Sequence, residues 1–215
     1  MRWGWERLAA LAGIVAVALW IAGVAVEEST TGREEDDAEG LLARYQNETD
    51  TVLASGFLLQ LGALFFLVFL IALRSRQFLA EGGSRPLTAL AFTGGVGVAL
   101  FMLAAPGAEM SGAINKEEIS AETALTLSNI GDIFFIGAEL SAVPFLAASG
   151  LLAVRMRALP AWWGWLSLVL ALWLVILPIG WAALIFGFPL WVLLTSVLLY
   201  LRPSTAPVST PATTS

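Results

Sequence analysis

Residues 121–157 read AETALTLSNIGDIFFIGAELSAVPFLAASGLLAVRMR, and this apolar run decides the fold because it alone carries ionisable side chains in its interior. Asp132 and Glu139 are seven residues apart, nearly two helical turns, so a helix places them on one face with Ser128 near the same line. A helix over residues 123–154 would be about 48 Å long, well beyond the ~30 Å hydrocarbon core of a bilayer. Asp132 is therefore expected near the outer interface and Glu139 about 10 Å deeper.

The composition excludes most soluble and catalytic classes of protein. Of the 215 residues, 58% are apolar, above the roughly 45–50% of a soluble domain, so the excess is expected to face lipid. The chain has no cysteine and no histidine, which removes disulfides, thiolate nucleophiles, the commonest metal ligand and the commonest general base. It also lacks phosphate-binding and zinc motifs. We expect no enzymatic activity, no metal centre, no nucleic-acid partner and no cofactor beyond a bound lipid or similar hydrophobic molecule.

Six apolar segments are long enough to be transmembrane helices. They lie at about residues 8–26, 51–73, 87–105, 123–154, 161–177 and 181–201. The first could be a cleaved signal peptide, but its nineteen uncharged residues exceed the usual roughly 7–15, so a retained anchor is expected. The uncharged run over residues 161–201 is too long for one helix and divides at the Leu-Pro-Ile-Gly turn of residues 177–180, with a kink expected near Pro189. Residues 203–215 are expected to be a disordered cytoplasmic tail.

The distribution of charge sets the expected topology. With six spans and a cytoplasmic N-terminus, eight arginines fall on the inner side, namely Arg2, Arg7, Arg74, Arg76, Arg85, Arg155, Arg157 and Arg202. The outer loops hold Arg33, Arg44 and Lys116 together with thirteen of the seventeen acids. This bias satisfies the positive-inside rule at every crossing. We predict an all-α bundle of six transmembrane helices in a cell membrane, with both termini cytoplasmic and the acidic loops extracellular.

Glu139 is the first candidate for a site within the bilayer. No basic side chain lies on a predicted span to pair with it, so it is expected to carry a proton rather than a charge in hydrocarbon. Gln60 lies at a similar depth on the second span, and Pro144 frees the carbonyl of Leu140. Together with Ser141 these groups could form a polar pocket that binds a ligand, a proton or a cation. The alternative is a protonated Glu139 that only joins neighbouring helices by a hydrogen bond.

A second candidate site lies toward the outer interface. Asp132, Asn129 and Ser128 could together coordinate a cation there, since all three offer oxygen ligands. The alternative is that these side chains simply contact headgroups and water. The acidic outer loops could likewise attract cations or a basic partner, or only provide a solvated surface.

The third predicted span carries glycines whose use is packing rather than chemistry. Gly94, Gly95 and Gly97 remove side-chain bulk and allow a neighbouring helix to approach closely. The neighbour is expected to be another helix of the same bundle. The alternative is a second copy of the chain or another membrane protein.

A motif at the junction of the fourth and fifth spans resembles a known group of proteins. It reads Gly150-Leu-Leu-Ala-Val-Arg155, followed by Leu159-Pro160-x-Trp-x-Gly164-Trp165-Leu166. It looks like the second half of the small bacterial six-helix membrane proteins of the domain-of-unknown-function 4386 type, and residues 38–74 fit the same layout. The resemblance implies a bacterial cell membrane and assigns no activity.

Two functions remain open from the sequence. The first is a non-enzymatic membrane protein that binds a partner protein or a lipid-like ligand in or on the bundle, surrounded by membrane lipids. The second is a small transporter or channel that uses Glu139 as a protonatable or cation-binding group. An enzyme that pairs Asp132 with Glu139 is not expected, because one helix holds them about 10 Å apart along its axis.

Overall fold

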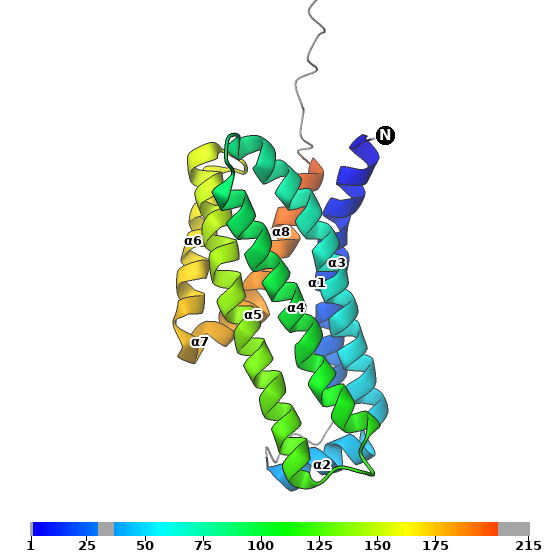
Figure 1. Ribbon diagram of the computed structural model, residues 1–215. Coiled ribbons are helices and arrows are strands. Elements are labelled where there is room, and N and C mark those ends of the chain that lie inside the picture. Colours follow the sequence, from blue (N-terminus) through cyan, green and yellow to red (C-terminus); the bar gives the residue numbers. More distant parts are fainter. Residues whose placement is uncertain (1, 30–36, 202–215) are drawn as a thin grey trace, which may run out of the picture.

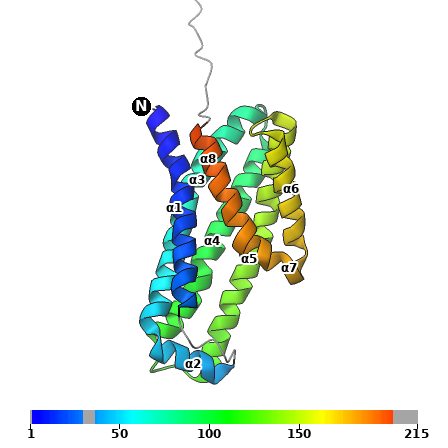
Figure 2. The same cartoon turned by 180° about the vertical axis from the view of Figure 1, so that it is seen from behind.

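The computed structural model describes residues 2–29 and 37–201, and over these ranges the chain forms helices and turns but no strand (Figures 1 and 2). The predicted tail, residues 203–215, lies outside the described residues. The elements are α1 (Arg2–Glu28), α2 (Ala38–Asn47), α3 (Thr49–Glu81), α4 (Pro86–Ile114), α5 (Ala121–Met156), α6 (Ala161–Val175), α7 (Leu177–Ala182), the π-helix η1 (Ala183–Gly187) and α8 (Phe188–Leu201). The all-helical prediction is therefore confirmed for the described part of the chain.

Among the described residues, five helical segments are long and apolar enough to cross a membrane, not the six predicted. Four are α1, α3, α4 and α5, and the fifth is the continuous stretch Ile179–Leu201. The predicted span at residues 161–177 is the 15-residue helix α6, only about 22 Å long. It ends at Val175, and Ile176 breaks the helix with a non-helical ψ of 77°. Pro178, two residues later, has no N–H to donate to the carbonyl of Leu174.

The helices run up and down in a single bundle, and their lengths differ. In Figure 1, α3, α4 and α5 run nearly its whole length, whereas the hairpin of α6, α7 and α8 reaches only part of the way from the upper end. Helix α1 begins and α8 ends at that same upper end (Figures 1 and 2). Helix α2 lies across the opposite end (Figure 1). The unequal lengths leave one end of the bundle with four long helices only.

Helix α4 is longer than predicted. It was expected to end near residue 105, yet it continues through Pro106 to Ile114. A proline within a helix removes one backbone hydrogen bond and leaves carbonyl oxygens of the preceding turn exposed. The side-chain amide of Gln60 in α3 donates to one of them, the carbonyl of Leu103, at 2.9 Å. A neighbouring helix therefore supplies a donor in the turn that Pro106 interrupts.

The last span is distorted where a kink was predicted. Pro189 has no N–H to donate to the carbonyl of Ile185, and its ring would clash with that carbonyl in a regular helix. The turn before it is the π-helix η1, in which the N–H of Phe188 donates to Ala183, five residues earlier. Widened turns of this kind are frequent beside functional sites. In this chain the widened turn brings Leu184 to a cavity described below.

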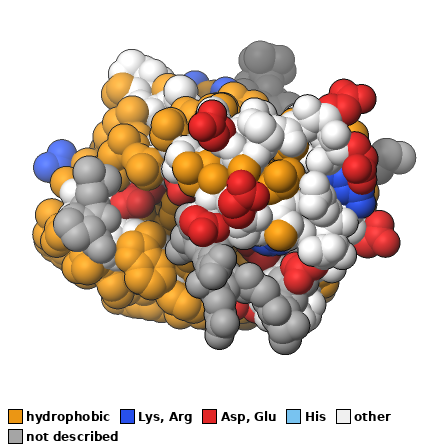
Figure 3. Space-filling model, turned by 90° about the horizontal axis from the view of Figure 1, so that it is seen from below, with side chains coloured by type: hydrophobic (Ala, Val, Ile, Leu, Met, Phe, Trp, Pro, Cys, Tyr) orange, Lys and Arg blue, Asp and Glu red, His pale blue; other side chains and the backbone are white. Residues whose placement is uncertain are grey.

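The two ends of the bundle differ in charge. The arginines near the end of α3, the start of α4 and the end of α5 lie at the end opposite α2; they are Arg74, Arg76, Arg85, Arg155 and Arg157. Acidic side chains gather on the face that carries α2, as Figure 3 shows. The predicted segregation of charge is thus present along the bundle.

Tyr45 anchors α2 to that acidic end. Its side chain is fully buried, and its ring packs so closely on α4 that a methyl group at Gly112 would overlap it. The hydroxyl oxygen is buried and has no hydrogen-bond partner among the described residues. Burial and, secondarily, the negative charge of Glu109 raise the pKa of Tyr45 to about 12, against a smaller opposing effect of Arg44. The neutral phenol therefore stabilises the docked position of α2.

Tyr45→Phe is expected to remove an alkaline unfolding step. The folded pKa lies above the unfolded value of 10.0, so the stabilisation is complete below pH 10 and is lost as the pH rises to about 12. The loss in the wild type amounts to about 2 kcal/mol. Between pH 8 and about pH 11, the unfolding temperature of Tyr45→Phe should decrease less than that of the wild type. Tyr200→Phe, near the end of α8, is the control, and an equal decrease in all three proteins would contradict the prediction.

Candidate functional site

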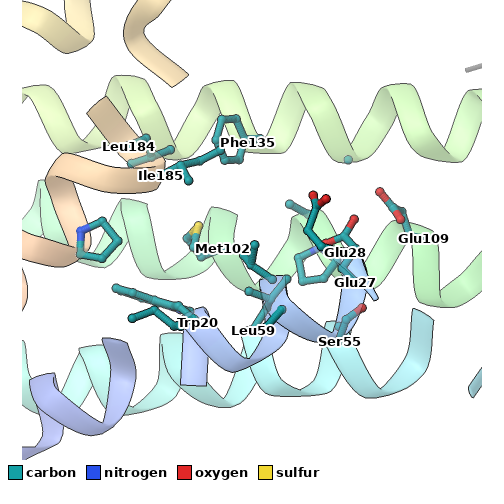
Figure 4. Close-up of a pocket in the computed structure, with 18 of the residues that line it drawn as sticks. Trp20, Glu27, Glu28, Ser55, Leu59, Met102, Glu109, Phe135, Leu184 and Ile185 are labelled. Atoms are coloured by element: carbon teal, nitrogen blue, oxygen red, sulfur yellow. The ribbon is translucent and has the colours of Figure 1, made fainter. Parts of the chain in front are cut away.

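A cavity of about 640 Å³ lies between α1, α3, α4, α5 and the start of the last span (Figure 4). Its cause is the short hairpin of α6 and α7. Helix α8 packs beside α1, and α6 packs beside α5, so that α1 and α5 are bridged near the arginine-rich end. From the level at which η1 and α8 begin to the end that carries α2, no described helix fills the space between α1 and α5. Leu184, Phe188 and Pro189 close the cavity from that side.

The interior of the cavity is apolar. Trp20 of α1, Leu59 of α3, Met102 of α4 and Phe135 of α5 line it, together with Leu184 of η1 (Figure 4). The indole of Trp20 is 4% exposed and its ring is held by neighbouring aromatic rings, one of them Phe66 at 5.6 Å between centroids. The apolar wall is therefore preformed, as in most small-molecule sites.

The end of the cavity nearer α2, called its mouth below, is acidic. Glu27 and Glu28 at the end of α1, Glu109 of α4 and Asp132 of α5 all line it. In Figure 4 the carboxylates of the three glutamates lie at one end of the cavity, away from Met102 and Leu184. Helix geometry separates the two levels by about 10 Å, because Trp20 and Glu27 are seven positions apart on α1. The cavity is amphipathic, with an apolar base and a mouth of like charges.

Among the described residues, Arg44 is bound at this mouth. Arg44 of α2 lies 3.3 Å from the carboxylate of Glu27 and 3.5 Å from that of Glu109. These side chains are only partly exposed, which strengthens the pairs over fully solvated ones. The pairs hold α2 across α1 and α4 beside the mouth. No lysine or arginine occurs among the described residues that line the cavity itself.

The predicted outer cation site stays a prediction, and the structure places its three residues within one turn of α5. Asp132 lines the mouth, but Ser128 and Asn129, also on α5, do not line the cavity. Across the described ranges, no group of three or more Asp or Glu side chains is close enough to hold a metal ion.

The structure also does not bring together Glu139, Gln60 and Ser141. Gln60 bonds Leu103 between α3 and α4, and the side chain of Ser141 faces α4 at Gly97. Glu139 instead faces α7, where a methyl group at Gly180 would overlap its Oε1 atom. Glu139 is 2% exposed, and Oε1 has no hydrogen-bond partner within the described part of the chain. The predicted polar pocket is therefore replaced by three separate helix contacts, because the three side chains point to different neighbours.

The three predicted packing glycines lie at contacts within the bundle. A methyl group at Gly94 would lie 2.8 Å from the backbone nitrogen of Phe145 on α5. One at Gly95 would meet the side chain of Leu70 on α3, and one at Gly97 would meet Ser141 on α5. The close approach of α4 to α5 depends on Gly94 above all, since backbone atoms cannot move aside as a flexible side chain can.

The residues that form the cavity were not predicted, apart from Asp132. Glu27, Glu28 and Glu109 stand at the ends of apolar segments, where an acid is usually part of a solvated loop. Their position relative to a helix end was visible in the sequence, but their convergence on one cavity depends on how the helices pack. Comparisons of the chain with protein-family models, with curated proteins and with solved structures find no match.

Proposed function

We propose that this chain is an integral membrane protein without enzymatic activity that binds a lipid-like or other hydrophobic molecule in the cavity between α1, α3, α4 and α5. The observation that carries the proposal is the preformed apolar space of about 640 Å³, which falls within the usual range of ligand pockets. Five long apolar helices make the bundle compatible with a membrane.

The proposed orientation follows from charge. The arginine-rich end lies in the cytoplasm, and the acidic end with α2 lies outside a bacterial cell membrane. Two observations support this: the described arginines of α3, α4 and α5 gather at one end, and α1 begins at that same end, where α8 also ends. The cavity then opens toward the outer interface, where an amphiphile arrives from water or from the outer leaflet.

The proposal is tested by filling the cavity. Ala105 of α4 lines it, and Ala105→Phe should place a ring in the space that a ligand would occupy. The probe is an alkyl diazirine with a hydroxyl head, photoactivated on the protein in lipid nanodiscs and mapped by mass spectrometry. We expect labels on Trp20, Met102 and Phe135 in the wild type and a loss of at least tenfold in Ala105→Phe.

Leu100→Phe is the matched control. Leu100 is on the same helix, is 57% exposed and does not line the cavity, so labelling of the three lining residues should be unchanged. Labels on outward-facing residues such as Leu172 report contact with bulk lipid in every variant. Wild-type labelling restricted to outward-facing residues would overturn the proposed function.

A further inference from the structure

We propose that the cavity selects amphiphiles with a cationic head, of the alkylammonium class. This inference rests on the proposed function and adds the chemistry of the head group. An alkyl tail gains little by leaving lipid for an apolar cavity, because lipid chains are as apolar as the leucine side chains that replace them. The selectivity of the site therefore comes from the polar end, and the polar end of this cavity is built from carboxylates.

The charge at the mouth favours one sign of head group. Four carboxylates, Glu27, Glu28, Glu109 and Asp132, come from three different helices and line one opening. An anionic head there would meet like charges, whereas a cationic head meets complementary ones. A neutral head gains no Coulomb attraction. The acidic end of the cavity favours a cationic head, and the apolar interior favours an alkyl tail. Both features therefore point to the same ligand class.

The form of the cation follows from the spacing of the acids. No group of three or more described carboxylates is close enough to coordinate a metal ion, so the site does not suit a small, strongly hydrated cation. A quaternary alkylammonium head is larger, is weakly hydrated and carries its own tail. With the head at the level of Glu27, the tail reaches Trp20 about 10 Å below along α1.

Arg44 acts as an internal competitor for the same carboxylates. Its guanidinium pairs with Glu27 at 3.3 Å and with Glu109 at 3.5 Å, so a ligand cation shares acids that are already partly neutralised. Removing the positive charge of Arg44 should strengthen binding of a cationic head. Removing the negative charge of Glu109 should weaken it. Opposite responses of two residues that pair with each other distinguish ligand electrostatics from loss of structure.

The experiment uses three photo-probes with one diazirine alkyl tail and trimethylammonium, hydroxyl or sulfonate heads, on the full chain in nanodiscs. For the ammonium probe, the concentration giving half-maximal labelling of Trp20, Met102 and Phe135 should rise about fivefold in Glu109→Gln and fall about fivefold in Arg44→Gln. The double variant Arg44→Gln/Glu109→Gln has the wild-type net charge and should return close to the wild-type value. The hydroxyl probe should respond to none of these changes, and the sulfonate probe should label the cavity least.

The controls separate this inference from the proposal on which it rests. Glu118→Gln removes an acid near the same end that does not line the cavity, and it should leave the ammonium probe unaffected. If all three probes label the cavity equally and no substitution matters, charge selection is overturned while the proposed function stands. If no probe labels the cavity, the proposed function is overturned as well. The inference would also be overturned if the double variant bound the ammonium probe as weakly as Glu109→Gln alone and had a lowered unfolding temperature. That result would assign the effect to the loss of ion pairs.

Discussion

Gly94→Ala is expected to destabilise the bundle by about 2 kcal/mol or more, although alanine is the better helix former by roughly 1 kcal/mol. The added methyl carbon would lie 2.8 Å from the backbone nitrogen of Phe145 and 3.0 Å from the backbone carbonyl oxygen of Ser141. Both atoms belong to the backbone of α5, so α4 and α5 must move apart along their contact. Thermal unfolding in detergent measures the effect, and we expect the unfolding temperature to fall by about 5 °C.

Gly107→Ala is the matched control for this prediction. Gly107 is on the same helix, and a methyl group there meets only the end of the Gln60 side chain at 3.4 Å, an ordinary contact. Its unfolding temperature should be unchanged or higher, because the gain in helix propensity is not opposed. Equal unfolding temperatures for Gly94→Ala and Gly107→Ala would show that α4 does not pack on α5 at Gly94 as described.

The second large effect is expected at Gly180. A methyl group at this position would overlap Oε1 of Glu139 and would lie 3.0 Å from the carbonyl oxygen of Leu174. Gly180→Ala is therefore expected to cost about 3 kcal/mol, in the range of overpacked core sites. In a Glu139→Ala background the carboxyl group is gone and the same change should cost about 1 kcal/mol. The difference, measured by a double-mutant cycle, gives a coupling of about 2 kcal/mol.

Gly187→Ala provides the internal comparison for the cycle. Its methyl group would meet the end of the Leu170 side chain at 2.7 Å, and Glu139 is not among its nearest neighbours. The cost of Gly187→Ala should be the same with and without Glu139. A coupling near zero between Gly180 and Glu139 would place the carboxyl group away from α7. Ion flux lost from vesicles of correctly folded Glu139→Ala protein would favour the transporter hypothesis over a packing role.

Much of the architecture could be predicted because it depends on local properties of the sequence. Hydropathy and segment length located the long helices, and the Leu-Pro-Ile-Gly turn of residues 177–180 placed the break before the last span. Proline chemistry predicted a distortion near Pro189, and the π-helix η1 lies in the turn before it. Helix ends were less accurate, since α4 continues through Pro106 to Ile114, and Gln60 of another helix donates to the carbonyl of Leu103 in the turn before that proline.

The candidate site needed the tertiary structure. The sequence predicted a polar pocket of Glu139, Gln60 and Ser141, because these residues lie at similar depths when positions are counted along each span. The count does not give the rotation of each helix about its axis, which decides the neighbour that a side chain faces. Packing instead turned Glu139 toward Gly180 and left the cavity elsewhere, between α1, α3, α4 and α5.

The sequence by itself determined that the chain is a charge-segregated bundle of apolar helices, since each residue carries its hydropathy and charge regardless of its neighbours. The tertiary structure decided which acids meet. Glu27, Glu109 and Asp132 lie far apart along the chain and come to one mouth because α6 is too short to extend beside the whole of α5. Convergence of this kind depends on relative helix length and packing, which are properties of the assembled bundle rather than of any one segment.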